Sequence, residues 1–169
     1  SWLETSVGAL TDGGCAPVAV VLGAAADRAR SMLGPGRDLA ILDNAAWGEG
    51  IGSSLRLALE WCMELDTRVS AAMVMLVDTP GIDSRVVRHM LFHAGSHDVL
   101  ARATYGEDGE PSHPVLLGRA HWAPICATSG GDEGAKGYLA RHPTRLIDCS
   151  AYGHGDDVDA QSHGPDRDA

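Results

Sequence analysis

The sequence predicts an α/β fold of the Rossmann-like kind, with a mostly parallel sheet and helices on both of its faces. Apolar runs rich in β-branched residues alternate along the chain with segments of helical spacing, which is typical of repeated βα units. The apolar run Met73–Val77 leads directly to Asp78, as expected of a strand that is buried on both faces of a parallel sheet. With 169 residues the chain is most simply one domain, which we expect to cover residues 1–159 and to be followed by a polar tail at 160–169.

Each element has its own local signal. A helix near Trp2–Thr11 is expected to stop at Gly13-Gly14, because glycine readily adopts the left-handed angles that end a helix. The spacing of Leu55, Leu59 and Met63 predicts a helix from Ser53 to about residue 65. The turn-rich segment 106–111 predicts an antiparallel excursion between its flanking strands. The other expected helices cover about 26–33, a segment that starts near 83–84, and about 133–141, and the other strands cover 18–22, 39–42, 99–105, 115–117 and 146–149.

Charge and cysteine content narrow the possible partners. The formal net charge is −10, from 13 Lys and Arg against 23 Asp and Glu, and no basic cluster of the kind that binds a nucleic-acid duplex is present. A nucleotide stays possible, because magnesium and helix N-termini bind phosphates without many cationic side chains. The four cysteines are scattered, and no apolar run could span a membrane. We therefore expect a cytoplasmic protein with buried thiols and with neither nucleic acid nor membrane as a partner.

Asp78 is the first candidate site residue. A carboxylate at the carboxyl end of a parallel strand lies where open α/β sheets bind their ligands, and Pro80 cannot continue the strand. Such a carboxylate suits a divalent cation that carries phosphates. The alternative is an aspartate that hydrogen-bonds the amides of its own turn.

Three further patterns have both a functional and a structural interpretation. The glycine-rich loop after Asn44 runs into a helix at Ser53, so it could cradle an anion or be a connector capped by serine. His113 enters a strand, where most histidines are only partly buried. The segment 129–137 lacks the Gly-Lys-Ser/Thr ending of a Walker loop, and Asp132 could simply cap the next helix. The histidines at 89, 93 and 97 could share one helix face, but a solvated face is the better interpretation than a metal site.

The order of these patterns resembles the molybdenum cofactor cytidylyltransferases, which are close to the molybdopterin nucleotidyltransferases. The resemblance rests on Asn44-x-x-Trp47-x-x-Gly50-x-x-Ser53-Ser54-Leu55, Leu76-Val77-Asp78-Thr79-Pro80, His113-Pro114-Val115, Gly131-Asp132-Glu133-Gly134-Ala135-Lys136 and the closing Asp157-Val158-Asp159. It implies a nucleotidyltransferase (GT-A-like) architecture over most of residues 2–159.

The sequence also departs from that family. The family opens with a strand and a Leu-Ala-Ala-Gly-x-Gly-x-Arg-Met-Gly loop that holds the triphosphate, and nothing like it occurs in this sequence. We therefore expect that a βα unit of about 30 residues belongs in front of Ser1, and that this chain alone is inactive. The family's Asp-Gln-Pro is here Asp78-Thr79-Pro80, and its Gly-His-Pro is Ser112-His113-Pro114.

The resemblance implies a reaction and a role for each residue. A nucleoside monophosphate would pass from a nucleoside triphosphate, with CTP favoured, to a phosphorylated acceptor such as molybdopterin, and pyrophosphate would leave; a molybdoenzyme could then receive the cofactor. Catalytic Asp78 would hold Mg²⁺ together with Asp157 or Asp159. The residues implied at the nucleotide are Asn44, Gly50, Ser53 and Ser54, and those implied at the acceptor are His113, Asp132 and Lys136.

Two alternatives stay open at this point. One is a related guanylyltransferase or an enzyme that acts on a sugar phosphate, because the choice of base depends partly on the family's N-terminal triphosphate-binding loop, which this sequence lacks. The other is a non-catalytic relative that binds a cofactor.

Overall fold

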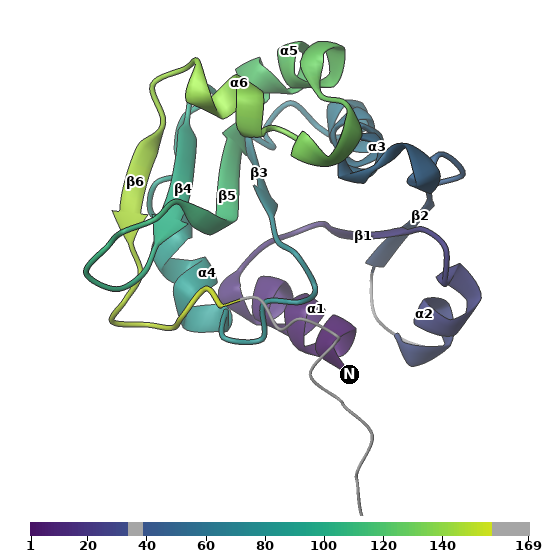
Figure 1. The fold of residues 1–169 in the computed structure, drawn as a ribbon, viewed down its shortest axis with the longest axis horizontal. Helices are drawn as coiled ribbons and strands as arrows, with labels where there is room; N and C mark the ends of the chain where they lie inside the picture. The colour runs from purple at the N-terminus through teal and green to yellow at the C-terminus, as the bar shows by residue number, and fades with distance from the viewer. Residues whose placement is uncertain (34–38, 157–169) are drawn as a thin grey trace, which may run out of the picture.

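The computed structural model describes residues 1–33 and 39–156, which form two adjacent sheets flanked by helices (Figure 1). The helices are α1 (Trp2–Gly13), α2 (Ala26–Met32), α3 (Ile51–Glu64), α4 (Ser84–Leu91), α5 (Arg119–Thr128) and α6 (Lys136–Ala140), with short 3₁₀ turns η1 (Trp47–Glu49) and η2 (Gly131–Glu133). The strands are β1 (Val18–Leu22), β2 (Leu39–Asp43), β3 (Ala71–Val74), β4 (Leu100–Thr104), β5 (Ser112–Gly118) and β6 (Arg145–Asp148).

The pairing of the strands confirms the α/β class and refines it. β1 and β2 form a parallel pair, and the larger sheet has the order β3-β5-β4-β6. β5 runs antiparallel to both β3 and β4, whereas β6 is parallel to β4. The connection between β4 and β5 is too short for a crossover, so these strands must pair as antiparallel neighbours, as the turn signals at 106–111 predict. The larger sheet is therefore mixed rather than mostly parallel.

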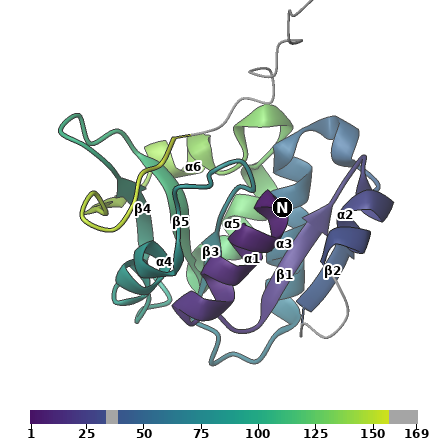
Figure 2. The ribbon, with the colours of Figure 1, turned by 90° about the horizontal axis from the view of Figure 1, so that it is seen from below.

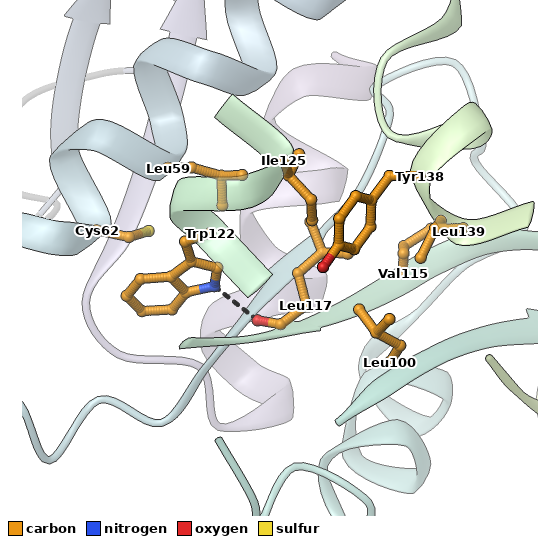
Figure 3. Packing of buried hydrophobic residues seen from close by; sticks show 9 residues of the cluster. All are labelled: Leu59, Cys62, Leu100, Val115, Leu117, Trp122, Ile125, Tyr138 and Leu139. Carbon is orange, nitrogen blue, oxygen red and sulfur yellow. Dashed lines mark hydrogen bonds between the residues drawn. The ribbon is translucent and has the colours of Figure 1, made fainter. Parts of the chain in front are cut away.

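Helices cover both faces of the larger sheet, as predicted, because its central strands alternate their apolar side chains. Val115 and Leu117 face a cluster that contains side chains of α3, α5 and α6 (Figure 3). Leu116 between them packs in a second cluster with side chains of α4. A third cluster joins β1 and β2 to α1 and α2. Val86 and Met90 of α4 are completely buried, as is Trp122 of α5.

Helix α5 was not predicted, because it contains Pro124, which normally interrupts a helix. Two side chains that precede this proline hold the helix in place. The indole Nε1 of Trp122 donates a hydrogen bond of 2.7 Å to the carbonyl of Leu117 (Figure 3). The Arg119 guanidinium donates to four carbonyls at the end of α3 and in the loop after it, those of Met63, Leu65, Asp66 and Val69. Long-range contacts therefore outweigh the local signal.

A gap separates the two sheets. β1 and β3 face each other across it, and in the described residues each is paired along one edge only (Figures 1 and 2). A cavity of about 510 Å³ lies here, lined on one side by residues 17–19 and on the other by Ala71–Val74. The further βα unit expected in front of Ser1 stays a prediction, as does the domain boundary at residue 159.

The four cysteines are free thiols. Cys62 and Cys149 are buried as predicted, and Cys15 and Cys126 are half-buried. Burial raises the pKa of Cys62 and of Cys149 to about 11, so these thiols stay protonated at neutral pH. Among the described residues, no helix has both the length and the apolar character needed to cross a membrane.

Candidate functional site

The residues expected at the acceptor substrate lie together around one cavity of about 270 Å³. His113 comes from β5, Asp132 from η2 and Lys136 from the start of α6, so three separate segments converge there. Aliphatic side chains complete the wall, including Ile51 and Leu55 of α3. This volume, at the lower end of the range for ligand pockets, suits one compact ring system with a phosphate rather than a whole dinucleotide.

An irregularity in the strand pairing places His113. Along β4, Arg102 pairs with Val115 but the next residue, Ala103, pairs with Ser112, so residues 113 and 114 bulge out of the ladder. Bulges are common beside active sites, because they redirect a side chain and end regular pairing. This one brings His113 to the cavity that Arg102 also lines.

Gly50 brings the α3 loop against the segment that carries Asp132. Gly50 has φ of 102°, and a Cβ there would lie 2.6 Å from Asp132 Oδ1. A Cβ on Gly52 would lie 2.9 Å from the backbone of Gly130. The glycines therefore serve a close approach between two segments of the protein, and they shape one rim of the cavity. A contact of Gly50 with a nucleotide stays a prediction.

Asn44, Ser53 and Ser54 lie close together, as expected, and they bond to one another. The buried Asn44 amide donates to both serine hydroxyls at 2.9 Å, and its Oδ1 accepts from the amide of Ala46. Ser53 Oγ also lies 2.9 Å from the carbonyl oxygen of Ala46, which can accept its hydrogen bond. None of these three side chains lines the cavity. The network fixes the loop in front of α3, and the predicted role in nucleotide binding stays a prediction.

Asp78 is exposed, and it lies in a turn four residues after β3, which ends at Val74. The expectation that Asp78 sits at the tip of the strand is therefore wrong in detail, because residues 75 and 76 leave the ladder first. The turn is held by Thr79, whose buried hydroxyl donates to the carbonyl of Leu76 at 2.8 Å. Leu76 lines the cavity, and Asp78 comes two residues after it in the chain.

Asp157 and Asp159 lie outside the described residues. The segment that leads toward them does run beside the Asp78 turn, since the His154 amide donates to the carbonyl of Gly81 at 3.3 Å. Residues 1–33 and 39–156 contain no group of three or more His, Cys, Asp or Glu residues arranged to hold a metal ion. The three histidines do not share one helix face, because α4 ends at Leu91, before both His93 and His97.

Glu133, inside the motif quoted above, also lines the cavity, and so does Arg102, which no sequence pattern assigned to a site. For Arg102 a signal exists. Arg102 lies two residues after Leu100 in β4, so the two side chains share one face of the strand. A charged side chain therefore occupies a position on the face that packs against helices. Such an inward-facing charge is uncommon unless it has a partner or a ligand.

This mixed α/β sheet, with a cavity between its strands and the helices that follow them, has the form of a nucleotidyltransferase domain. The chain matches the MobA-like NTP transferase domain over residues 1–146 and belongs to that family, which confirms the resemblance. Families of this kind transfer a nucleotidyl group from a nucleoside triphosphate.

Solved structures agree with this assignment. Rv0371c from Mycobacterium tuberculosis H37Rv is 22% identical, with a TM-score of 0.71 over 94% of this chain and 79% of that chain. Its complex with manganese gives a TM-score of 0.68 at 22% identity, over 89% of this chain and 77% of that one. The Rv0371c homolog from Mycobacterium sp. strain JC1 is 24% identical, with a TM-score of 0.70 over 89% and 73%. These likenesses show the fold. No curated protein matches the chain.

Proposed function

We propose that the protein transfers a nucleoside monophosphate from a nucleoside triphosphate, CTP being the favoured donor, to a phosphorylated acceptor such as molybdopterin. The observation that carries this proposal is the gathering of His113, Asp132 and Lys136 around one cavity in a chain of the NTP transferase family. Molybdopterin as acceptor and CTP as donor rest on the sequence resemblance.

The reaction requires positioning and neutralisation of charge more than covalent chemistry. An oxygen of the acceptor's phosphate attacks the α-phosphorus, the bond from that phosphorus to the bridging oxygen breaks, and pyrophosphate leaves with the electron pair. Lys136 is exposed at the rim of the cavity, where its ammonium group can approach the acceptor's phosphate. The aliphatic wall formed by Ile51, Leu55 and Leu139 would hold the apolar part of the acceptor.

A divalent cation fits the chemistry of the donors that the chain offers. Rv0371c was crystallised with manganese, which supports a similar requirement here. Asp78 supplies an exposed carboxylate, the hard oxygen donor that Mg²⁺ and Mn²⁺ prefer. Asp157 or Asp159 would add the second carboxylate. A bound cation would neutralise charge on the phosphates of the nucleotide.

A non-catalytic, cofactor-binding relative is the second candidate. The observation that favours it is that the side chains of Asn44, Ser53 and Ser54 use one another as partners. A donor phosphate in this region would then depend on the first backbone amides of α3, which has no side-chain cap. A guanylyltransferase or an enzyme that acts on a sugar phosphate is a variant of the first proposal and differs from it in base or acceptor.

Replacing the Asp78 carboxylate tests the proposal. In the natural protein that carries this chain, we expect D78N to reduce Mn²⁺-dependent release of pyrophosphate by about a hundredfold or more, because a cation ligand is lost. Mn²⁺ binding, followed by electron paramagnetic resonance, should weaken in parallel. The free energy of unfolding should change by less than about 0.5 kcal/mol, because the side chain is exposed.

D27N is the matched control, since Asp27 is exposed in α2, outside the proposed site. The assay should compare all four triphosphates with molybdopterin as acceptor. Wild-type turnover retained in D78N would remove Asp78 from the mechanism. Binding of molybdopterin without pyrophosphate release from any triphosphate would favour the non-catalytic candidate.

A further inference from the structure

Among the described residues that line this cavity, Arg102 alone has a buried side-chain nitrogen without a hydrogen-bond partner. Its Nη2 donates to the carbonyl of Pro111 at 2.9 Å, which fixes the guanidinium plane next to the start of β5. Its Nε is buried and has no hydrogen-bond partner among the described residues. An unsatisfied buried donor is costly, and it is more so for a charged group. Arg102 as a whole is only half-buried and lines the cavity, so its positive charge can act on a ligand there.

The carboxylates around the cavity do not satisfy this charge. In the described part of the chain, Arg102 forms no ion pair with Asp132 or Glu133. Asp132 Oδ1 lies against Gly50, and Glu133 Oε2 lies near Gly137 on α6. Burial lowers the pKa of Arg102 from its usual range, with no neighbouring carboxylate to raise it again. The guanidinium nonetheless stays charged at neutral pH.

Two cationic groups and an imidazole, from three elements, line this cavity. Arg102 of β4 and Lys136 of α6 carry positive charge, and the imidazole of His113 lies on the wall that β5 contributes. A planar guanidinium together with an ammonium group is a frequent arrangement for binding phosphate, because the guanidinium offers parallel N–H groups and the ammonium a point charge. The carboxylates of Asp132 and Glu133 also line the cavity, and the rest of the wall is largely aliphatic, which suits a ring system attached to that phosphate.

We propose that Arg102 binds the phosphate monoester of the acceptor through its guanidinium group, while Lys136 neutralises the same phosphate. The assignment of this phosphate to the acceptor rests on the proposed function. It is favoured over the nucleotide because Asn44, Ser53, Ser54 and Asp78 do not line this cavity. Arg102 thereby becomes a residue that orients the attacking oxygen, and sequence reasoning gave it no such role.

The test measures binding rather than turnover. Titration calorimetry of the 169-residue protein with phenyl phosphate, whose ring and monoester match the cavity, should give a dissociation constant that rises about tenfold to a hundredfold in R102Q. R102K keeps the charge but loses the planar fork, and we expect an intermediate affinity. The control R28Q removes an exposed arginine of α2 and should bind as the wild type does.

The outcomes separate this proposal from the proposed function. Equal affinity in R102Q and the wild type overturns the role of Arg102, whether or not the protein transfers nucleotides. Arg102-dependent binding, together with no pyrophosphate release by the natural protein from any triphosphate, keeps the phosphate site and rejects the transferase. If R102Q does not fold, R102K decides the matter, because unchanged affinity in that variant contradicts a role for the planar fork.

Discussion

At the residue scale, Asn44 shows how a polar side chain beside a candidate site can form its hydrogen bonds within its own loop and the start of the next helix. Its amide group donates to Ser53 and Ser54, and its carbonyl oxygen accepts from the backbone. The sequence pattern predicted correctly that these residues lie together. It could not show that they bond to one another, because side chains that bind a phosphate and side chains that fix a loop have the same composition.

The stability of N44A measures this network. We expect the substitution to lower the free energy of unfolding by about 2 kcal/mol or more, because three hydrogen bonds of a buried group are lost. S54A removes one of them and should cost about 1 kcal/mol or less. Urea unfolding followed by circular dichroism gives both values. An N44A variant as stable as the wild type would show that the network adds nothing to folding.

The same scale explains why Arg102 was missed while His113 was found. His113 precedes a proline at the start of an apolar run, and this local pattern survives in the sequence. The importance of Arg102 depends on what surrounds it, namely a bulge in its pairing with β5 and a cavity closed by α6. Those neighbours are 9 and more residues away along the chain, and no short pattern records them.

At the scale of elements, helix α4 illustrates a strong local signal. Asp83 was expected near the start of this helix, and its carboxylate accepts from the amide of Arg85 at 2.8 Å as the N-cap. Val86, Val87 and Met90 then bury one face completely. Capping and apolar spacing are both local, so the sequence predicted this helix well. Helix α5 is the opposite case, since distant contacts hold it around Pro124.

The cap of α4 leads to a prediction about pH. The Arg85 guanidinium beside Asp83 holds the pKa of that carboxyl below its usual range. A lowered pKa in the folded state means that the ionised group adds stability above its unfolded pKa of about 3.9, and that this gain is lost as the pH falls through the folded value. We expect D83A to cost about 1 kcal/mol at pH 7 and progressively less below pH 4.

D83N is the matched control for this cap. Asparagine also caps helices well, so D83N should stay within about 0.5 kcal/mol of the wild type at pH 7. Its difference from the wild type should disappear in acid, because the wild-type carboxyl is then protonated and is neutral like the amide of asparagine. Chemical unfolding at several values of pH between 3 and 7 measures both variants. A constant penalty for D83A over this range would contradict the contribution of charge.

At the scale of the whole molecule, the alternation of strands and helices was readable from sequence, but the division into two sheets was not. Each strand has its own apolar pattern in the sequence, whereas the strand that pairs with it is determined by the tertiary structure. β1 and β3 both line the cavity of about 510 Å³ but do not pair with each other. β1 and β2 are held instead by the cluster that includes Leu3, Val7 and Val20.

This arrangement predicts that the two sheets differ in local stability. A two-stranded pair is weak by itself, and the unpaired edges at the gap leave backbone groups of β1 and β3 without a neighbouring strand. The inner strands β4 and β5 are paired on both sides and carry mostly buried residues. Segments that open more readily exchange their amide hydrogens faster. We therefore expect exchange in β1–β2 to be at least about tenfold faster than in β4–β5.

Hydrogen exchange followed by mass spectrometry can measure this difference with peptides that cover 18–22 and 39–43 against peptides that cover 100–104 and 112–118. V20A, which weakens the β1–β2 cluster, should widen the difference, because Val20 belongs to that cluster alone. V86A lies under the larger sheet and should reduce protection there. Equal exchange in both sheets, unchanged by V20A, would mean that the protein opens as one cooperative unit, and that the gap between β1 and β3 has no energetic consequence.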